Sequence, residues 1–400
     1  MQSQDLLSVL RTVKRKANVA VIYSGNPKEA RNVLFKSLNP RTWKSYQRVA
    51  QDIVEALKLL GFQNVFLFKE GAELTRKLKQ HNIQYAWLNS GGVQGFDAAG
   101  HCAATLQSLG IPYVGHTPLQ SSLMDDKVFF KHFLLGAGFR TAPFLTWHPK
   151  DHKRHQDHIT FEQKLKNIFS WDNGRCVVKP ATGRASQHVY IAENMQDVMA
   201  LCQKVYSETG NKVLVEQFLS GREYCVAVMG RPINEKSSKS SWWINRHQST
   251  CCFAHLERVL EDKHSIFTSM DVRPINDTVV RKLSHDSDGH IIQELNAVAQ
   301  SLYNRLGLHG LIRLDLRMDA AGRLHILEAN PKPDLKAPEG NVSSLVAMGI
   351  EQIGLNYPEL IEQLFIQSLD YHLSYAVTPS QLSWMQTDPE LEQSIDGVAL

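Results

Sequence analysis

The sequence has no long apolar run. A transmembrane helix needs about 20 mostly apolar residues, and no stretch of this chain approaches that length. A signal-peptide order is missing as well, because the basic cluster at 14–16 follows the short apolar patch at the N-terminus instead of preceding it. We therefore expect a cytoplasmic protein without a membrane partner.

Cysteine is scarce and forms no motif. None of the six cysteines belongs to a C-x-x-C spacing. Disulfide frameworks are typical of small secreted domains, whereas 400 residues can bury a large core. We expect most of the cysteines to be reduced, small and buried apolar side chains.

An excess of one charge is also missing. The chain has 44 lysines and arginines against 40 aspartates and glutamates, a formal net charge of +4. This balance argues against a dedicated nucleic-acid-binding protein, although it allows a local site for an anionic ligand. The two commonest nucleotide fingerprints, G-x-x-x-x-G-K-[ST] and G-x-G-x-x-G, are absent too.

The length of 400 residues predicts two or three domains. In the N-terminal part, short β-branched runs such as 19–23 and 85–88 alternate with helical periodicity. This alternation predicts a doubly wound parallel sheet covered by helices, that is, an α/β domain. Ligands bind such sheets at the carboxyl ends of the strands, which here are the turns at 24–26 and 89–95.

The pattern changes after residue 118. A helix over 124–135 and strands that end near 179 and 216 predict a small α+β unit, and a second α+β unit follows. The last 30 residues lose their periodicity and predict a peripheral tail. The expected units have the bounds 1–118, 119–216, 217–370 and 371–400.

The segment 310–329 predicts a β-hairpin with a turn at 319–322. Strand alternation places Asp315 on one face, and Glu328 and Asn330 share a face of the partner strand. Together these side chains form an oxygen cluster of the kind that holds magnesium. A charged face exposed to solvent is the alternative interpretation.

Two lysines favour a phosphate site. Lys179 ends an apolar strand before a loop of small residues, which suits a point charge that binds phosphate. Lys127 opens a helix. Either lysine could also be ordinary surface charge.

Six segments resemble, in their order and separation, the landmarks of ATP-grasp ligases, and more narrowly of the D-alanine–D-alanine ligase branch. The segments are 111–115, 124–127, 177–180, 215–223, 310–315 and 327–331. The resemblance implies an ATP-grasp fold with an N-terminal pre-ATP-grasp domain. It also implies an ATP- and magnesium-dependent ligase that forms an amide or peptide bond through an acyl phosphate.

The resemblance implies a nucleotide site as well. Lys127 and Lys179 match the lysines on the ATP phosphates, and Glu223 matches the acid that binds the ribose hydroxyls. The hinge that binds adenine corresponds to Glu216, Gln217, Phe218 and Leu219.

Metal and catalytic roles follow from the same resemblance. Two magnesium ions, for which manganese is a possible substitute, would be held by Asp315, Glu328 and Asn330. Arg313 would steady the acyl phosphate, and Ser186 is the serine that remains in the loop over the phosphates.

The segments that face the substrates depart from the family pattern. The loop at 181–188 keeps one glycine and one serine, and Asp334 stands where the family has a glycine that helps to form an oxyanion hole. Ser343 and Ser344 are candidates for the serine that binds the carboxylate of the second amino acid. We therefore expect small-molecule substrates, an amino acid or a dipeptide, that differ from a pair of D-alanines. A homodimer is compatible with the resemblance.

Two other functions stay open. A phosphotransferase could use the same nucleotide site and stop at a phosphorylated product. A nucleotide-binding regulator with weakened catalysis would fit the departures at 181–188 and at Asp334.

Overall fold

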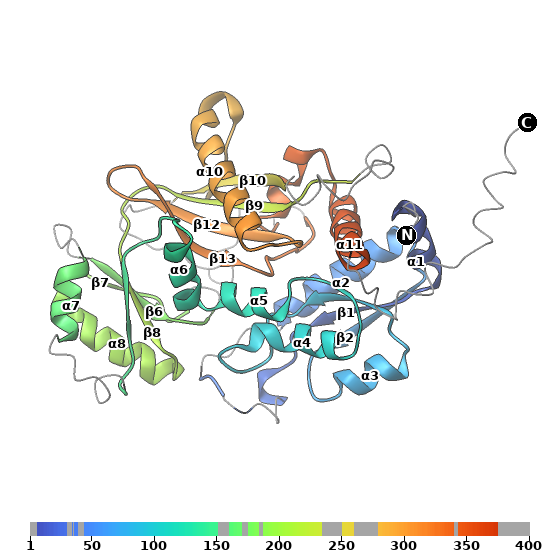
Figure 1. Cartoon of the computed structure of the whole chain (residues 1–400), viewed down its shortest axis with the longest axis horizontal. Coiled ribbons are helices and arrows are strands. Elements are labelled where there is room, and N and C mark those ends of the chain that lie inside the picture. Colours follow the sequence, from blue (N-terminus) through green and yellow to red (C-terminus); the bar gives the residue numbers. More distant parts are fainter. Residues whose placement is uncertain are drawn as a thin grey trace, which may run out of the picture.

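The computed structural model describes most of the chain. The described residues are 6–29, 34, 36–38, 44–150, 160–169, 175–183, 187–233, 250–259, 279–339 and 343–374. They form three β-sheets with their helices (Figure 1). Ser186 and most of the predicted tail lie outside the described residues. None of the described helices is long and apolar enough to cross a membrane.

The N-terminal sheet is parallel and has a hydrophobic core on each face. Its strands, in the order β2-β1-β3-β4, are β1 (Asn18–Tyr23), β2 (Asn64–Lys69), β3 (Tyr85–Asn89) and β4 (Tyr113–Val114). The connecting helices are α2 (Lys44–Leu59), α3 (Leu74–Gln80) and α4 (His101–Ser108). Along β1, Val19 and Val21 belong to one core, whereas Ala20 and Ile22 belong to the other. The predicted doubly wound sheet is confirmed.

Two further helices, which the sequence pattern did not predict, complete the first of these cores. They are α1 (Leu6–Lys16) and α11 (Tyr357–Leu373). Their apolar residues share a core with α2, and Figure 1 shows the three helices together. Lys14 on α1 forms an ion pair with Glu362 on α11. The two ends of the described chain are therefore packed against each other.

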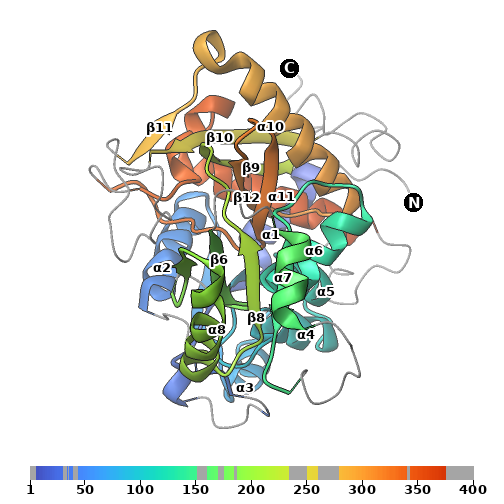
Figure 2. The ribbon, with the colours of Figure 1, turned by 90° about the vertical axis from the view of Figure 1, so that its left-hand side faces the viewer.

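The central sheet is antiparallel. Its strands, in the order β5-β8-β6-β7, are β5 (Phe144–Trp147), β6 (Cys176–Pro180), β7 (Tyr190–Ala192) and β8 (Val213–Gln217). The helices α7 (Phe161–Ile168) and α8 (Met195–Thr209) contribute to its core. Figure 2 shows this sheet below the C-terminal sheet.

The C-terminal sheet is also antiparallel. Its strands, in the order β11-β10-β9-β12-β13, are β9 (Glu223–Gly230), β10 (Thr250–Arg258), β11 (Val280–Lys282), β12 (Ile312–Met318) and β13 (Leu324–Asn330). Helix α10 (His285–Arg305) packs on one face. The predicted hairpin is confirmed as β12 and β13. The sequence pattern did not predict β10, and within 235–270 the structure describes residues 250–259.

The helix predicted over 124–135 is instead two helices. α5 (Pro118–Asp125) ends and α6 (Lys127–Gly136) begins at Asp126, which has an extended backbone with φ −86° and ψ 107°. The Asp126 carboxylate accepts hydrogen bonds from two backbone N–H groups in the first turn of α6. An aspartate whose side chain accepts hydrogen bonds from backbone N–H groups favours the N-cap position over the interior of a helix. The break places Lys127 at a helix N-terminus.

Two histidines, His116, which is buried, and His309, which is partly buried, join the N-terminal sheet to the C-terminal sheet. Nε2 of His116, which follows β4, lies 3.2 Å from the carbonyl oxygen of Leu311. Nε2 of His309, which precedes β12, lies 2.9 Å from the carbonyl oxygen of Gly115. In each contact a histidine side chain from one part of the chain lies against a backbone carbonyl of the other, so the two contacts hold the two sheets together.

Replacing His116 with glutamine is expected to make the stability less sensitive to acid. Burial lowers the pKa of His116 from 6.5 to about 4, so between these values the unfolded chain binds a proton that the folded protein does not. The stabilisation is complete above pH 6.5 and is lost as the pH falls toward 4. At pH 5 the wild type should have lost about 2 kcal/mol through this group relative to pH 7. Urea unfolding at both pH values tests this, with the exposed His101→Gln as the control. The same pH dependence in wild type and His116→Gln would contradict it.

The cysteines behave as the sequence predicts. All six are free, four of them are buried and the other two are partly buried. None therefore contributes a disulfide to the fold.

Candidate functional site

Lys127 connects two segments that the sequence assigns to the site. Its Nζ donates a hydrogen bond of 3.2 Å to the carbonyl of Gly183, in the loop after β6. The same Nζ lies 3.5 Å from Oε2 of Glu328 on β13. The helix break therefore places one lysine between the predicted phosphate loop and the predicted magnesium ligands.

A cluster of buried charges lies where the central sheet meets α6. Glu216 on β8 is 3% exposed. Its Oε1 accepts a hydrogen bond from Lys179 on the neighbouring β6, and its Oε2 lies 2.9 Å from Nζ of Lys131. Lys131 lies one turn after Lys127 on α6 and is fully buried. Burial would raise the pKa of Glu216, but the two lysines lower it to about 2. The carboxylate is therefore ionised at neutral pH.

The same cluster connects the central sheet to the hairpin. Nζ of Lys131 donates to Oγ1 of Thr141 at 2.6 Å, and that hydroxyl donates to the carbonyl of Ile326 on β13 at 2.8 Å. A polar path therefore runs from Glu216 through Lys131 and Thr141 to the strand that carries Glu328. Because its members are buried, the path restricts how β8 and β13 can move relative to each other.

The predicted adenine hinge leads from the central sheet to the C-terminal sheet. Gln217 ends β8, and Phe218 and Leu219 are buried. The guanidinium of Arg317 lies 4.7 Å from the centroid of the Phe218 ring, and that of Arg175 lies 5.8 Å from it. Both distances are within the range of cation–π contacts. Adenine binding by the hinge stays a prediction.

Acidic and basic side chains alternate across β9, β10 and β12. Arg313 donates two hydrogen bonds, of 2.9 and 2.8 Å, to the carboxylate of Asp315. Arg258 lies 3.2 Å from Asp315 and donates a hydrogen bond of 2.8 Å to Glu223. Arg317 lies 3.3 Å from the other oxygen of Glu223. We refer to these five residues as the arginine network. It brings the predicted site residues Glu223, Arg313 and Asp315 together with Arg258 and Arg317.

The predicted magnesium ligands differ in their surroundings. Asp315 is 3% exposed, both of its oxygens accept hydrogen bonds from Arg313, and its carboxylate also contacts that of Glu328. Its role as a metal ligand stays a prediction. Glu328 has a side chain that is 31% exposed. Asn330 donates through its amide nitrogen to Asp315 at 3.4 Å, which directs its carbonyl oxygen elsewhere.

Glu328 and Asn330 thus offer the oxygen donors that magnesium prefers, and such an ion usually keeps several water ligands. Within the described ranges, no group of three His, Cys, Asp or Glu side chains could hold a metal by itself. The donor set fits a partly hydrated ion at Glu328 and Asn330 better than an ion enclosed by protein ligands.

The predicted ligand edge of the N-terminal sheet is closely packed. The hydroxyls of Ser24 and Ser90 lie 3.1 Å apart, and the N–H of Gly91 donates to Ser24 at 3.0 Å. Gly92 has a φ of +90°, and a Cβ at this position would lie 2.4 Å from the backbone of Ala98. The position therefore requires glycine.

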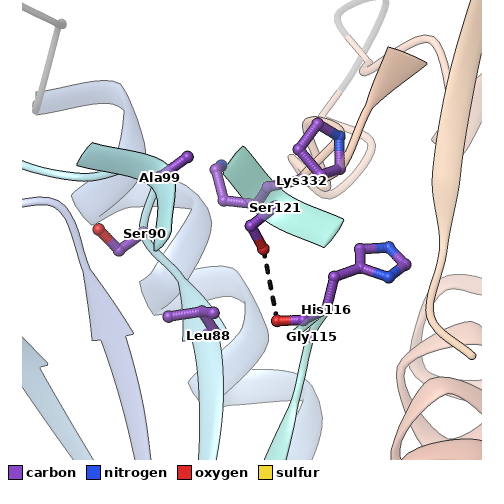
Figure 3. Close-up of a pocket in the computed structure, with 8 residues that line it drawn as sticks. Leu88, Ser90, Ala99, Gly115, His116, Ser121 and Lys332 are labelled. Carbon is purple, nitrogen blue, oxygen red and sulfur yellow. Dashed lines mark hydrogen bonds between the residues drawn. The ribbon is translucent and has the colours of Figure 1, made fainter. Parts of the chain in front are cut away.

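A small pocket lies beside this edge, next to the end of β13 (Figure 3). Its lining residues are Leu88, Ser90, Ala99, Gly115, His116, Ser121, Pro331 and Lys332. Its volume is about 20 Å³, which is room for about one water molecule. An amino acid would require the surrounding loops to move.

The residues predicted to bind substrate are engaged in local turns. The Asp334 carboxylate accepts a hydrogen bond from the N–H of Lys336 at 3.0 Å. Ser344 is fully buried, and its hydroxyl accepts from the N–H of Ala347 at 3.1 Å. The Ser343 hydroxyl donates to the carbonyl of Ser344 at 3.4 Å. Their roles toward a substrate stay predictions.

The sequence interpretation did not identify Lys131 and Arg258 as site residues. Lys131 had a usable signal, because a residue four positions after Lys127 lies on the same face of a helix. Arg258 had none, because it lies on β10, a strand that the sequence pattern did not predict.

Comparisons with known proteins agree on one family. The family model for the D-ala D-ala ligase C-terminus matches residues 133–366. The D-alanine–D-alanine ligase of Pseudoalteromonas translucida is 25% identical over 356 residues, which cover 88% of this chain and 97% of the relative. The enzyme of the same name from Marinomonas sp. is 26% identical over 362 residues, which cover 88% of this chain and 96% of the relative.

A solved structure shows the same fold. The D-alanine–D-alanine ligase of Bacillus anthracis, crystallised with ATP, superposes with a TM-score of 0.64 at 17% identity, covering 89% of this chain and 98% of that one. The predicted ATP-grasp fold is thereby confirmed. The family match covers more than half of the 400 residues, so the chain belongs to the D-alanine–D-alanine ligase family, whose members are ATP-dependent ligases that form carbon–nitrogen bonds.

Proposed function

We propose that this protein uses ATP to join a carboxylate to an amine, both of the amino-acid or dipeptide type. The observation that carries the proposal is the position of Lys127, which contacts both the loop after β6 and Glu328 on β13. The ATP-bound relative from Bacillus anthracis supports a nucleotide in this fold. The departures at 181–188 and Asp334 support substrates other than two D-alanines.

The proposed reaction has two steps. A substrate carboxylate oxygen attacks the terminal phosphorus of ATP, and ADP leaves. The amine nitrogen then attacks the acyl carbon, phosphate leaves, and the nitrogen gives up a proton as the amide forms. Both steps gather negative charge between the nucleotide and the substrate, so fixed cations in a site with little water stabilise them.

This chain's own residues would supply most of that positive charge. Lys127 and Lys179 would bind the phosphates, and Glu216 keeps Lys179 in place through their buried ion pair. Arg313 would face the acyl phosphate while its Nε and Nη2 stay bonded to Asp315. Magnesium, when bound at Glu328 and Asn330, would neutralise phosphate charge.

Other parts of the proposal depend on the resemblance alone. They are the adenine contacts of 216–219, the ribose contact of Glu223, substrate binding by Asp334, Ser343 and Ser344, manganese as a substitute metal, and a homodimer. The proposed unit bounds of 1–118, 119–216 and 217–370 also stay predictions.

A product screen tests the proposed function. The full-length protein is incubated with ATP, magnesium and a panel of amino acids and dipeptides, and ADP, phosphate and the organic products are measured by coupled assay and mass spectrometry. We expect equal amounts of ADP and phosphate together with an amide product for at least one pair of substrates. ADP and a stable phosphorylated product without free phosphate would indicate a phosphotransferase. Nucleotide binding without turnover on any substrate would indicate a regulator.

A further inference from the structure

The loop that joins β6 to β7 is tied at its first end to the segment after helix α8. Nδ2 of Asn211 donates to the carbonyl of Thr182 at 3.0 Å and to the hydroxyl of the same residue at 2.7 Å. Both Asn211 and Thr182 are buried. The backbone is therefore fixed just before Gly183, whose carbonyl accepts a hydrogen bond from Lys127.

The second end of the loop is tied to the last turns of the same helix. Nδ1 of His188 lies 2.9 Å from Oε2 of Glu208, and the hydroxyl of Tyr190, the first residue of β7, donates to that oxygen at 2.8 Å. Lys204, one turn earlier on α8, places its Nζ 4.2 Å from the centroid of the Tyr190 ring. We refer to His188, Tyr190, Lys204 and Glu208 as the loop anchor.

The charge of Glu208 holds the loop anchor together. Hydrogen bonds from His188 and Tyr190 lower the pKa of Glu208 from its usual value of 4.5, so this carboxylate is ionised at neutral pH. An ionised carboxylate can only accept hydrogen bonds, and Nδ1 of His188 therefore carries the proton in this contact. The side chains of His188 and Glu208 are 28% and 32% exposed. A pair this exposed adds little to the stability of the whole fold, which favours a local role.

The backbone of His188 supports the same interpretation. Its φ is +57°, in the left-handed region that costs free energy for a residue with a side chain. Such conformations cluster at functional sites and persist where the surrounding structure enforces them. The contact between His188 and Glu208 is such a constraint. Because 181–188 contains a single glycine, Gly183, the loop reaches this conformation with a histidine.

We propose that His188 and Glu208 are positioning residues for the nucleotide. They fix the second end of the loop after β6, as Asn211 fixes the first, so that the loop is already in place to receive the ATP phosphates. A loop that is ordered before binding loses less conformational entropy when the ligand arrives, and its affinity is higher for that reason. This inference rests on the proposed nucleotide site, and it gives neither residue a direct contact with the nucleotide.

Nucleotide titrations of the full-length protein test the inference without turnover. His188→Gly removes the imidazole, and glycine adopts a positive φ without strain, so urea unfolding should show that the fold persists. We expect the Kd of a non-hydrolysable ATP analogue, measured with magnesium by isothermal titration calorimetry, to rise about tenfold, the effect of losing roughly one hydrogen bond. The Kd of adenosine should stay unchanged, because adenosine has no phosphates for the loop to receive.

Two further variants complete the test. Asn82→Gly is the matched control, because it also replaces a residue of positive φ, +47°, with glycine, but it lies after α3; the Kd of the ATP analogue should not change. Glu208→Gln removes the charge on the other side of the contact and should raise this Kd as His188→Gly does. The double variant should bind no more weakly than either single variant, since the two residues act through one contact.

The possible results separate this inference from the proposed function. An unchanged Kd of the ATP analogue in His188→Gly would overturn the inference while leaving the nucleotide site in place. An equal loss of affinity for adenosine would also overturn it, because the loop anchor would then support the fold in general. So would additive losses in the double variant. If His188→Gly does not fold, as judged by circular dichroism, Glu208→Gln decides. Absence of nucleotide binding in the wild type would overturn both the inference and the proposed function.

Discussion

Replacing Glu328 with glutamine is expected to lower turnover by roughly 10²–10³-fold, the range seen when one charge-stabilising group is removed from an active site. The variant keeps the shape of the side chain and loses the negative charge with which Glu328 would hold a metal ion. The Glu328 side chain is 31% exposed, and its ion pair with Lys127 is 3.5 Å long. Such a pair contributes about 0–1 kcal/mol to stability, so the fold should persist. Steady-state rates of ADP release test the loss of turnover, and urea unfolding tests whether the fold persists.

Glu362→Gln is the matched control for this prediction. Glu362 has a similar exposure of 26% and is also paired with a lysine, Lys14, but it lies on α11. Its substitution should leave turnover unchanged. Full activity of Glu328→Gln would exclude Glu328 as a metal ligand. An equal loss of activity in both variants would point to a general effect on the fold.

Replacing Glu216 with glutamine is expected to lower the free energy of unfolding by about 3–5 kcal/mol, because it leaves the buried charges of Lys131 and Lys179 without their shared counterion. The Lys131 side chain is fully buried, and that of Lys179 is 9% exposed. The nucleotide affinity should fall as well, since Lys179 would lose the contact that keeps it in place. Urea unfolding and titration with a non-hydrolysable ATP analogue measure the two effects.

Glu257→Gln is the control for burial. Glu257 also lies between two cations, Arg222 and Arg281, but their side chains are 51% and 41% exposed. This variant should lose no more than about 1 kcal/mol. A loss of similar size in both variants would contradict the view that burial makes the Glu216 cluster important.

The Glu216 cluster also predicts a pH dependence. The pKa of Glu216 is lowered from 4.5 to about 2 in the folded protein. Its stabilisation is therefore complete above pH 4.5 and is lost as the pH falls toward 2. This range lies mostly below the range of pH 6.5 to 4 in which His116 acts. The free energy of unfolding should therefore fall in two stages as the pH is lowered, and Glu216→Gln should remove only the stage at lower pH.

Much of the fold follows from local patterns. The β-branched run at 19–23 and the alternation along 312–318 predict strands because a two-residue period places every second side chain in a core. The helix over 124–135 was wrong at one residue, since Asp126 can either sit inside a helix or cap one. In the structure its carboxylate caps α6 by accepting hydrogen bonds from the N–H groups of Val128 and Phe129.

The sequence by itself determined the family, the hairpin and the set of lysines and acids that form the candidate site, because their order and spacing along the chain suffice to identify them. Only the tertiary structure decided which charges meet. Arg258 and Asp315 are 57 positions apart, as their residue numbers show, and they touch because β9 pairs with both β10 and β12. Lys131 reaches Glu216 because α6 packs against the central sheet. Contacts of this kind depend on strand pairing and burial, which no local pattern specifies, and they determine whether a carboxylate is free to bind a metal or is already neutralised by an arginine.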